Sequence, residues 1–314
     1  MIAAHILTLL VAGSALTAEL PSHHEVRFAA DLGLVGRFVP LRTAVQNILE
    51  APRNIALARG LKTLGIDPLR DLKQLAIGWQ VAVGGGPPRS LALIAGNFSR
   101  RRVESGLRKL KSGRLIEQKH RRYTLWVDSV SGQMLSLRAN GKALMGSPAS
   151  VRAGLYSKRK PRKRPQFLRG APVWFEAPVT PALRRVLGDT DPGSPLALVR
   201  RVRARLDLVE QTLRLQARLN CASSADANGL SMTLNLAATA LAFRQPKLAV
   251  LLARVGFMPQ GKSVVVRATI DRETLAKIVA LGHPRPANAT GTQRRKTPVK
   301  PRGKASPKVR PQSP

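Results

Sequence analysis

Two neighbouring segments in the second half of the chain, 203–208 and 213–219, alternate strictly between apolar and polar positions. The apolar positions are Ala204, Leu206, Leu208, Leu213, Leu215, Ala217 and Leu219. The intervening positions are Arg203, Arg205, Asp207, Arg214, Gln216 and Arg218. A repeat of two residues is typical of strands with one buried face. The pattern therefore predicts a half-buried antiparallel hairpin with a solvated, arginine-lined face.

A unit of strands and helices is predicted over residues 25–156. Its expected strands are 25–31, 72–83, 89–98, 123–129 and 133–147. Its expected helices carry apolar residues three or four positions apart, at Leu41, Val45, Ile48 and Leu49 and again at Val103, Leu107 and Leu110. Ser99 is a favourable cap for the second of these helices. Ser147 and Pro148 predict the start of a short helix that ends the unit.

A second unit over residues 171–282 repeats this order. A strand over 172–178 and a helix from 180 precede the hairpin; Ser223 or Ser224 then caps a helix and Pro246 opens another. A strand over 263–270 and a helix capped by Asp271 end the unit. We interpret the chain as a duplicated α+β protein with two similar halves, each an antiparallel sheet with helices packed on one face.

Two basic segments, 157–170 and 283–314, contain no acidic residue. Neither can bury enough apolar surface to offset the entropy lost on ordering. We predict a basic linker or loop over 157–170 and a disordered basic tail over 283–314. The candidate polyanion-binding residues of these segments are Lys158, Arg159, Lys160, Arg162, Lys163, Arg164, Arg294, Arg295, Lys296, Lys300, Arg302 and Lys304.

The charge of the chain is strongly positive. Its 314 residues include 53 Lys and Arg against 17 Asp and Glu, which gives a formal net charge of +36. This excess implies attraction to polyanions such as nucleic acid, anionic lipid or acidic polysaccharide, although a codon bias toward arginine would also produce it. Only 4% of the residues are aromatic. Side chains on which single-stranded bases could stack are therefore scarce.

The first segment, 1–18, resembles a secretory signal peptide. It has an apolar run from Ile6 to Ala12, followed by small residues, and no charged side chain before Glu19. The missing Lys or Arg near the start leaves two alternatives, a misplaced start codon or an ordinary first strand or helix. The interpretation as a signal peptide predicts a periplasmic or secreted protein.

The string GFMPQGKS, 256–263, matches the phosphate-loop pattern letter for letter. A functional phosphate loop follows a strand and opens a helix. Here the preceding segment is interpreted as a helix and the segment after Ser263 as a strand. Gly256 is then expected just beyond the end of a helix, with Pro259 and Gly261 forming the turn. The order of elements excludes nucleotide binding at this loop.

No other motif indicates catalysis or metal binding. The histidines do not cluster at metal-ligand spacing; they are His5, His23, His24, His120 and His283. Asp67 and Asp71 indicate a helix start or turn, and Asp189 and Asp191 a turn. The single cysteine, Cys221, is expected to be a small buried side chain. We therefore expect a protein that is not an enzyme and has no cofactor or metal.

Three stretches resemble a known family: LGIDPLRDLKQLAIGWQ (64–80), 121–155, and LQARLNCASSADANGL (215–230). They are similar to an uncharacterised family of predicted secreted α+β proteins common in myxobacteria and related bacteria. The resemblance extends from about Val26 to Leu281 and rests on turns and helix caps. It implies extracytoplasmic location and assigns no catalytic residues. The basic loop and tail depart from the more neutral members of that family.

Two functions follow as hypotheses. The first is a non-enzymatic extracytoplasmic binding or scaffold protein, with anionic envelope polymers or lipids as partners. The alternative is a polyanion- or nucleic-acid-binding protein that acts through the basic loop and tail. Nucleic acid is expected as the partner only if the protein is cytoplasmic.

Overall fold

The structure is a computed structural model that describes residues 20, 24–39, 42–43, 46, 55–80, 89–110, 114–156, 165–186, 189, 191, 193–210 and 212–275. The contacts divide the chain into a unit over 1–282 and a unit over 283–314, and every described residue belongs to the first. The signal-like segment, most of the helix expected at 41–49, the segment 157–164 and the basic tail lie outside the described residues.

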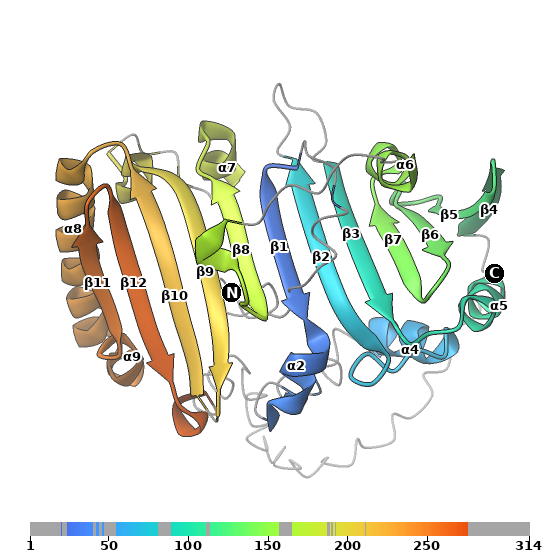
Figure 1. Ribbon diagram of the computed structural model, residues 1–314, viewed down its shortest axis with the longest axis horizontal. Coiled ribbons are helices and arrows are strands. Elements are labelled where there is room, and N and C mark those ends of the chain that lie inside the picture. Colours follow the sequence, from blue (N-terminus) through green and yellow to red (C-terminus); the bar gives the residue numbers. More distant parts are fainter. Residues whose placement is uncertain are drawn as a thin grey trace, which may run out of the picture. The chain divides into compact units, whose positions relative to one another are not determined.

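The described strands form one antiparallel sheet of twelve strands (Figure 1), in the order β11-β12-β10-β9-β8-β1-β2-β3-β7-β6-β5-β4. The first strands of the two halves, β1 (Val26–Asp31) and β8 (Val173–Pro178), pair at its middle with Phe28 opposite Phe175. The α+β class is as expected. The two halves were expected to form separate sheets, but their strands form a single sheet. Pairing of β1 with β8 satisfies backbone groups that would otherwise be left at two free edges.

The first half contributes seven strands. After β1 its elements are α2 (Leu32–Arg37), α4 (Ile55–Thr63), β2 (Leu72–Gln80), β3 (Arg89–Gly96), α5 (Arg100–Lys109), β4 (Leu115–His120), β5 (Tyr123–Asp128), β6 (Met134–Arg138), β7 (Lys142–Gly146) and α6 (Pro148–Tyr156). Ser99 caps α5, because its hydroxyl accepts a hydrogen bond from the backbone N–H of Arg102. The edge strand β4 was not predicted, since its residues are mostly polar and exposed.

The second half contributes five strands. After a short 3-10 turn, η3 (Gln166–Leu168), its elements are β8, α7 (Pro181–Val186), η4 (Pro195–Leu198), β9 (Val199–Val209), β10 (Thr212–Cys221), α8 (Ser224–Arg244), α9 (Pro246–Leu252), β11 (Val255–Gln260) and β12 (Ser263–Ile270). Ser223 caps α8 in a reciprocal box, with 3.0 Å from Asp226 N to Ser223 Oγ and 3.0 Å from Ser223 N to Asp226 Oδ2. The side chain of Asp271 accepts a hydrogen bond from the backbone N–H of Thr274 at 2.7 Å, as expected of a helix cap.

Both faces of the sheet are apolar in the first half. Successive strand residues point to opposite faces, so Leu93 and Ile94 of β3 face opposite ways. Leu93 packs with Val151 and Leu155 of α6, and Ile94 packs with Val103 of α5. We name the two surfaces the α6 face and the α5 face. Helices therefore cover both faces here, which differs from the expected single covered face, because each apolar face must be shielded from water.

Only the α5 face is apolar over most of the second half. There α8 contributes Ala227 and Leu230 to a cluster with Cys221 and Val264. Leu275, after β12, joins a second cluster on this face with Leu206 and Leu213. Figure 1 shows α8 beside β11. The α6 face of β9, β10 and β12 is lined mainly by polar side chains.

Candidate anion-binding site

Arginines gather on the α6 face of β9, β10 and β12 because polar and apolar residues alternate along these strands. We call this surface the arginine face; it consists of Arg201, Arg203, Arg205, Arg214, Gln216, Arg218 and Arg267. On the described part of the surface every cation is an arginine, and the acids are Glu176 of β8 and Asp207 of β9.

The strand register brings these arginines side by side. Arg203 lies opposite Arg218, and Arg205 lies opposite Gln216. On the other side of β10, Arg267 lies opposite the same Gln216. Residues whose side chains share one face of a sheet are about 7 Å apart along a strand and about 5 Å apart between neighbouring strands. Like charges directly opposite each other destabilise a sheet, so this arrangement carries an electrostatic cost.

Two carboxylates offset the charge on β9. Glu176, with only 6% of its surface exposed, accepts a hydrogen bond from Nε of Arg203 at 3.0 Å. A terminal nitrogen of Arg201 lies 3.7 Å from the same oxygen. Asp207 accepts two hydrogen bonds from Arg205, at 2.8 and 2.7 Å. Three of the six arginines are therefore held in ion pairs.

The turn η3 lies against the middle of the arginine face. Arg205 donates a hydrogen bond to the backbone oxygen of Phe167 at 3.0 Å. The guanidinium carbon of Arg218 lies 4.8 Å from the centre of the Phe167 ring, a cation–π distance. Nε of Arg218 is buried and has no hydrogen-bond partner. Ring stacking, rather than an acid, therefore positions this guanidinium.

The other three arginines, which we call uncompensated, form no ion pair within the described residues; Arg214 lies opposite Asp207 on β9, but that acid is held by Arg205. Among the described residues, no carboxylate forms an ion pair with Arg214, Arg218 or Arg267. Arg214 and Arg267 are exposed, whereas Arg218 is half-buried. An anion at this surface would gain attraction from three guanidinium groups without displacing an acid that already holds them. Guanidinium groups bind carboxylate, sulfate and phosphate through paired hydrogen bonds.

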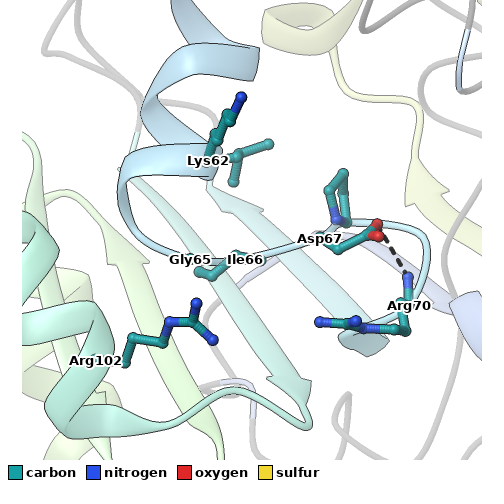
Figure 2. Close-up of a pocket in the computed structure, with 8 residues that line it drawn as sticks. Lys62, Gly65, Ile66, Asp67, Arg70 and Arg102 are labelled. Atoms are coloured by element: carbon teal, nitrogen blue, oxygen red, sulfur yellow. Dashed lines mark hydrogen bonds between the residues drawn. The ribbon is translucent and has the colours of Figure 1, made fainter.

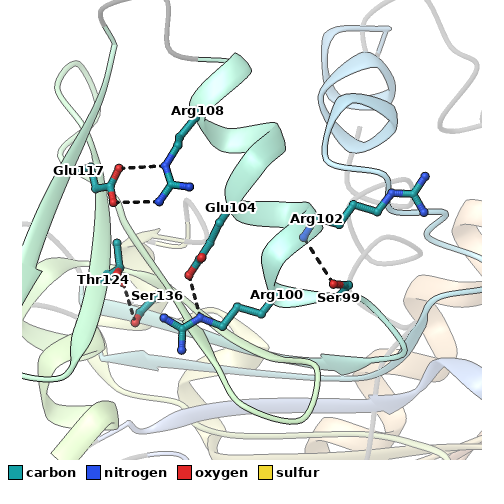
Figure 3. Close-up of polar contacts among 8 residues, drawn as sticks. All are labelled: Ser99, Arg100, Arg102, Glu104, Arg108, Glu117, Thr124 and Ser136. Atoms are coloured by element: carbon teal, nitrogen blue, oxygen red, sulfur yellow. Dashed lines mark hydrogen bonds and ion pairs between the residues drawn. The ribbon is translucent and has the colours of Figure 1, made fainter.

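Several arginines of the first half are held in ion pairs. On α5, Arg100 pairs with Glu104 at 2.7 Å and Arg108 with Glu117 of β4 at 3.3 Å (Figure 3). Arg114 pairs with Asp128 at 2.9 Å. This arginine, together with the backbone N–H groups of Ser131 and Val130, lowers the pKa of Asp128 to about 2. These cations are already satisfied by acids of the same half.

A hollow of about 380 Å³ lies where α4 meets the turn before β2 (Figure 2). Lys62, Arg70 and Arg102 line it, but Arg70 donates to Asp71 at 2.9 Å. That hydrogen bond, and to a lesser degree one from the backbone N–H of Asp67, lowers the pKa of the Asp71 carboxyl group. Asp67 and Asp71 thus form a turn, as interpreted from the sequence. Because these acids offset the cations, the hollow is a weaker anion site than the arginine face.

A second hollow, of about 520 Å³, adjoins the arginine face at the tip of the β9–β10 hairpin. Its lining includes Arg214 and Asp207 of that face, Arg37 at the end of α2 and Glu210, so two acids offset its two arginines. The arginine face therefore continues into a recess at the end marked by Arg214.

The string GFMPQGKS forms a hairpin. Ser263 begins a strand as expected, and because a strand rather than a helix follows the loop, the geometry of a phosphate loop is excluded. Gly256 and Pro259 lie within β11, however, and the expectation of a helix end at Gly256 is wrong. Pairing of β11 with β12 prevails over the helical pattern before Gly256, and the turn falls at Gly261, whose φ is 56°.

Cys221 is buried as expected, with 7% of its surface exposed. Burial, and to a lesser degree the charge of Asp226, raises the pKa of its thiol, which disfavours a reactive thiolate. Across the described part of the chain, no three potential metal-ligating side chains come together. None of the described helices is long and apolar enough to cross a membrane.

The candidate residues of the basic segments, Lys158 to Arg164 and Arg294 to Lys304, lie outside the described residues. The structure therefore brings together a different set of cations from the set chosen by sequence. The signal for it was present in the alternation over 203–218, which predicted the arginine-lined face without assigning it a function. Arg267 had no such signal, because its position depends on pairing with a strand about 50 residues away.

Comparison with known proteins identifies a shared fold. No family model matches the chain, and no curated protein matches it at a significant level. Two solved structures of TP0453 are similar, in crystal forms III and IV, with 11% and 10% sequence identity and a TM-score of 0.51 in each case. Each comparison covers 84% of this chain, and they cover 97% and 96% of the respective TP0453 chains. At this identity the likeness is one of fold, extending over nearly all of TP0453.

Proposed function

We propose that this protein is a non-enzymatic, extracytoplasmic binding protein that holds anionic ligands on its arginine face. The observation that carries the proposal is the group of three uncompensated arginines, Arg214, Arg218 and Arg267, on an open sheet surface. Binding there replaces repulsion among guanidinium groups with attraction to the ligand. Nothing in the proposal requires a reacting group.

Extracytoplasmic location is supported by the apolar run and small residues of segment 1–18. It agrees with the resemblance to a family of predicted secreted proteins, and membership in that family is part of the proposal. Sequencing the N-terminus of the mature protein from fractionated cells tests this part. An intact Met1 in the cytoplasmic fraction would refute it and make nucleic acid the expected partner.

Duplication of an α+β unit is also part of the proposal. In each half a first strand leads to a hairpin, β2–β3 or β9–β10. The second strand of that hairpin then pairs with the last strand of the same half, β7 or β12. On this view the binding surface arose in one copy of the unit through its polar α6 face.

Heparin provides a probe for the arginine face. The variant Arg214→Gln/Arg218→Gln/Arg267→Gln should bind heparin at least about tenfold more weakly than the natural chain near 0.1 M salt. The slope of log affinity against log salt should also fall by about three, one for each lost contact. Isothermal titration at several salt concentrations measures both quantities.

A matched control separates this site from general charge. Arg101→Gln/Arg152→Gln/Arg185→Gln removes three exposed arginines outside the arginine face and should leave heparin affinity within about twofold, because long-range attraction is screened. A third variant lacks residues 283–314. If this deletion weakens heparin binding about tenfold or more while the arginine-face variant binds normally, the basic tail is the binding element and the proposal for the arginine face fails.

A further inference from the structure

Gln216 lies at the centre of the three uncompensated arginines. Arg214 and Arg218 are two residues before and after it on β10, and Arg267 lies directly opposite it on β12. Strand geometry places the two β10 arginines about 7 Å to either side of Gln216 and the β12 arginine about 5 Å away. Among the described residues, none forms a hydrogen bond with the Gln216 side chain.

The amide of Gln216 both donates and accepts hydrogen bonds, whereas guanidinium groups only donate. A ligand that uses the whole group must therefore present anionic groups to the arginines and a neutral donor or acceptor between them. Thr269, exposed and opposite Arg214, adds a hydroxyl at the edge of the same group. The oxygens of inorganic polyanions such as polyphosphate accept hydrogen bonds but offer no donor when ionised, so they would leave the carbonyl oxygen of the Gln216 amide without a partner.

Aromatic platforms are lacking at this group. The described residues of the arginine face on β9, β10 and β12 include no aromatic side chain. The neighbouring ring, Phe167, is already stacked against Arg218. Proteins that hold single-stranded nucleic acid commonly stack bases on exposed aromatic rings, and such stacking contributes about 1–3 kcal/mol per base. The surface is therefore poorly equipped to hold unpaired bases.

We propose that the arginine face is specific for an anionic polysaccharide, whose carboxylate or sulfate groups bind Arg214, Arg218 and Arg267 while a sugar hydroxyl binds the amide of Gln216. This inference rests on the proposed function, since it names the ligand class for the same surface. Hydroxyl-bearing rings separate the charges of such a polymer, which matches one neutral amide among three guanidinium groups. The polymer would lie along β10, between Arg214 and Arg218.

The test compares two ligands on two sets of variants. A heparin hexasaccharide carries charges and hydroxyls that can donate hydrogen bonds, whereas polyphosphate offers only anionic acceptor oxygens. Gln216→Ala should weaken hexasaccharide binding about three- to tenfold, as expected for loss of one hydrogen bond, with an unchanged salt slope. Polyphosphate affinity should fall by less than about twofold, because polyphosphate offers no donor to the amide oxygen. Gln216→Val serves as a second variant that also removes the amide. Valine favours strands and alanine does not, so a loss shared by both variants is not caused by a weakened strand.

Each result decides a separate point. Equal losses for hexasaccharide and polyphosphate, or no loss for either, would overturn the role of Gln216 and with it the assignment of a polysaccharide. If the triple arginine variant still binds both ligands more weakly, the proposed function survives that failure. Tighter binding of an oligothymidylate than of the hexasaccharide by the natural chain would identify nucleic acid as the ligand instead. If the triple variant binds every ligand normally, both proposals fail.

Discussion

The same α6 face of one continuous sheet is closed in the first half of the molecule and open in the second. Over β3 and β7 it presents Leu91, Leu93 and Leu144, and α6 packs on them. Over β9, β10 and β12 it presents arginines, and among the described elements the short 3-10 turn η3 packs on them through Phe167. An apolar face needs a cover to exclude water, whereas a charged face remains stable in water. The difference indicates which surface is available for a ligand.

The last helix of each half accounts for this difference. In the first half, α6 follows β7 and packs on the α6 face through Val151 and Leu155. In the second half, the segment capped by Asp271 follows β12 and contributes Leu275 to the α5 face. The helices after the two central hairpins, α5 and α8, both pack on the α5 face. The final helices of the two halves thus pack on opposite faces of the sheet.

Leu91→Ala should have the largest effect on stability, because Leu91 lies in the apolar region that α6 covers. Leu91 is fully buried under α6, and its truncation leaves a cavity that costs about 2–5 kcal/mol of unfolding free energy. Arg218→Gln in the open region should change that free energy by less than about 1 kcal/mol, while weakening heparin binding. Urea unfolding measures both values. Equal destabilisation by the two substitutions would remove the distinction between a closed and an open region.

Glu176→Gln should have the next largest effect. It is expected to lower the stability of the fold and to raise the affinity for heparin. It removes the buried charge that holds Arg203 and Arg201, which should lower the unfolding free energy by about 1–3 kcal/mol. The same change frees two arginines, so heparin affinity should rise a few-fold with a steeper salt dependence. Thermal unfolding and heparin titration of one sample measure both results. Weaker heparin binding by a folded variant would show that the ion pairs, not the free cations, form the site.

Local patterns allowed much of the second half to be predicted. Strict alternation over 203–219 gave the hairpin, its buried set and its arginine-lined set, since side-chain direction in a strand depends only on position. Ser223 and Asp271 were identified as caps for the same reason, because capping is decided within one turn of helix. The caps and hairpins therefore needed no knowledge of distant parts of the chain.

Features set by distant pairing could not be predicted. The opposition of Arg267 to Gln216 depends on the register of β12, and the single sheet depends on β1 finding β8. The segment before Gly256 has a helical pattern, yet Val255 already belongs to β11 because β12 offers hydrogen bonds to it. Whether a terminal helix covers one face or the other is decided by the apolar surface left exposed, which no local pattern reveals.

The smallest expected effect is on stability at low pH. Arginines are held in ion pairs only while their partner carboxylates are ionised, so a low pH removes the contrast between paired and unpaired arginines. Asp128 has its pKa lowered to about 2 by Arg114 and two backbone N–H groups, against about 3.9 in an unfolded chain. A lowered pKa in the folded state means that the stabilisation is complete above the unfolded value and is lost as the pH falls toward 2. Asp128→Asn lacks this contribution, so its melting temperature should lie slightly below that of the natural chain at pH 7. The two should converge between about pH 4 and pH 2, as followed by circular dichroism. A constant difference across that range would mean that Asp128 stabilises the turn through shape rather than charge, and that Arg114 is no better compensated than the arginines of the open half.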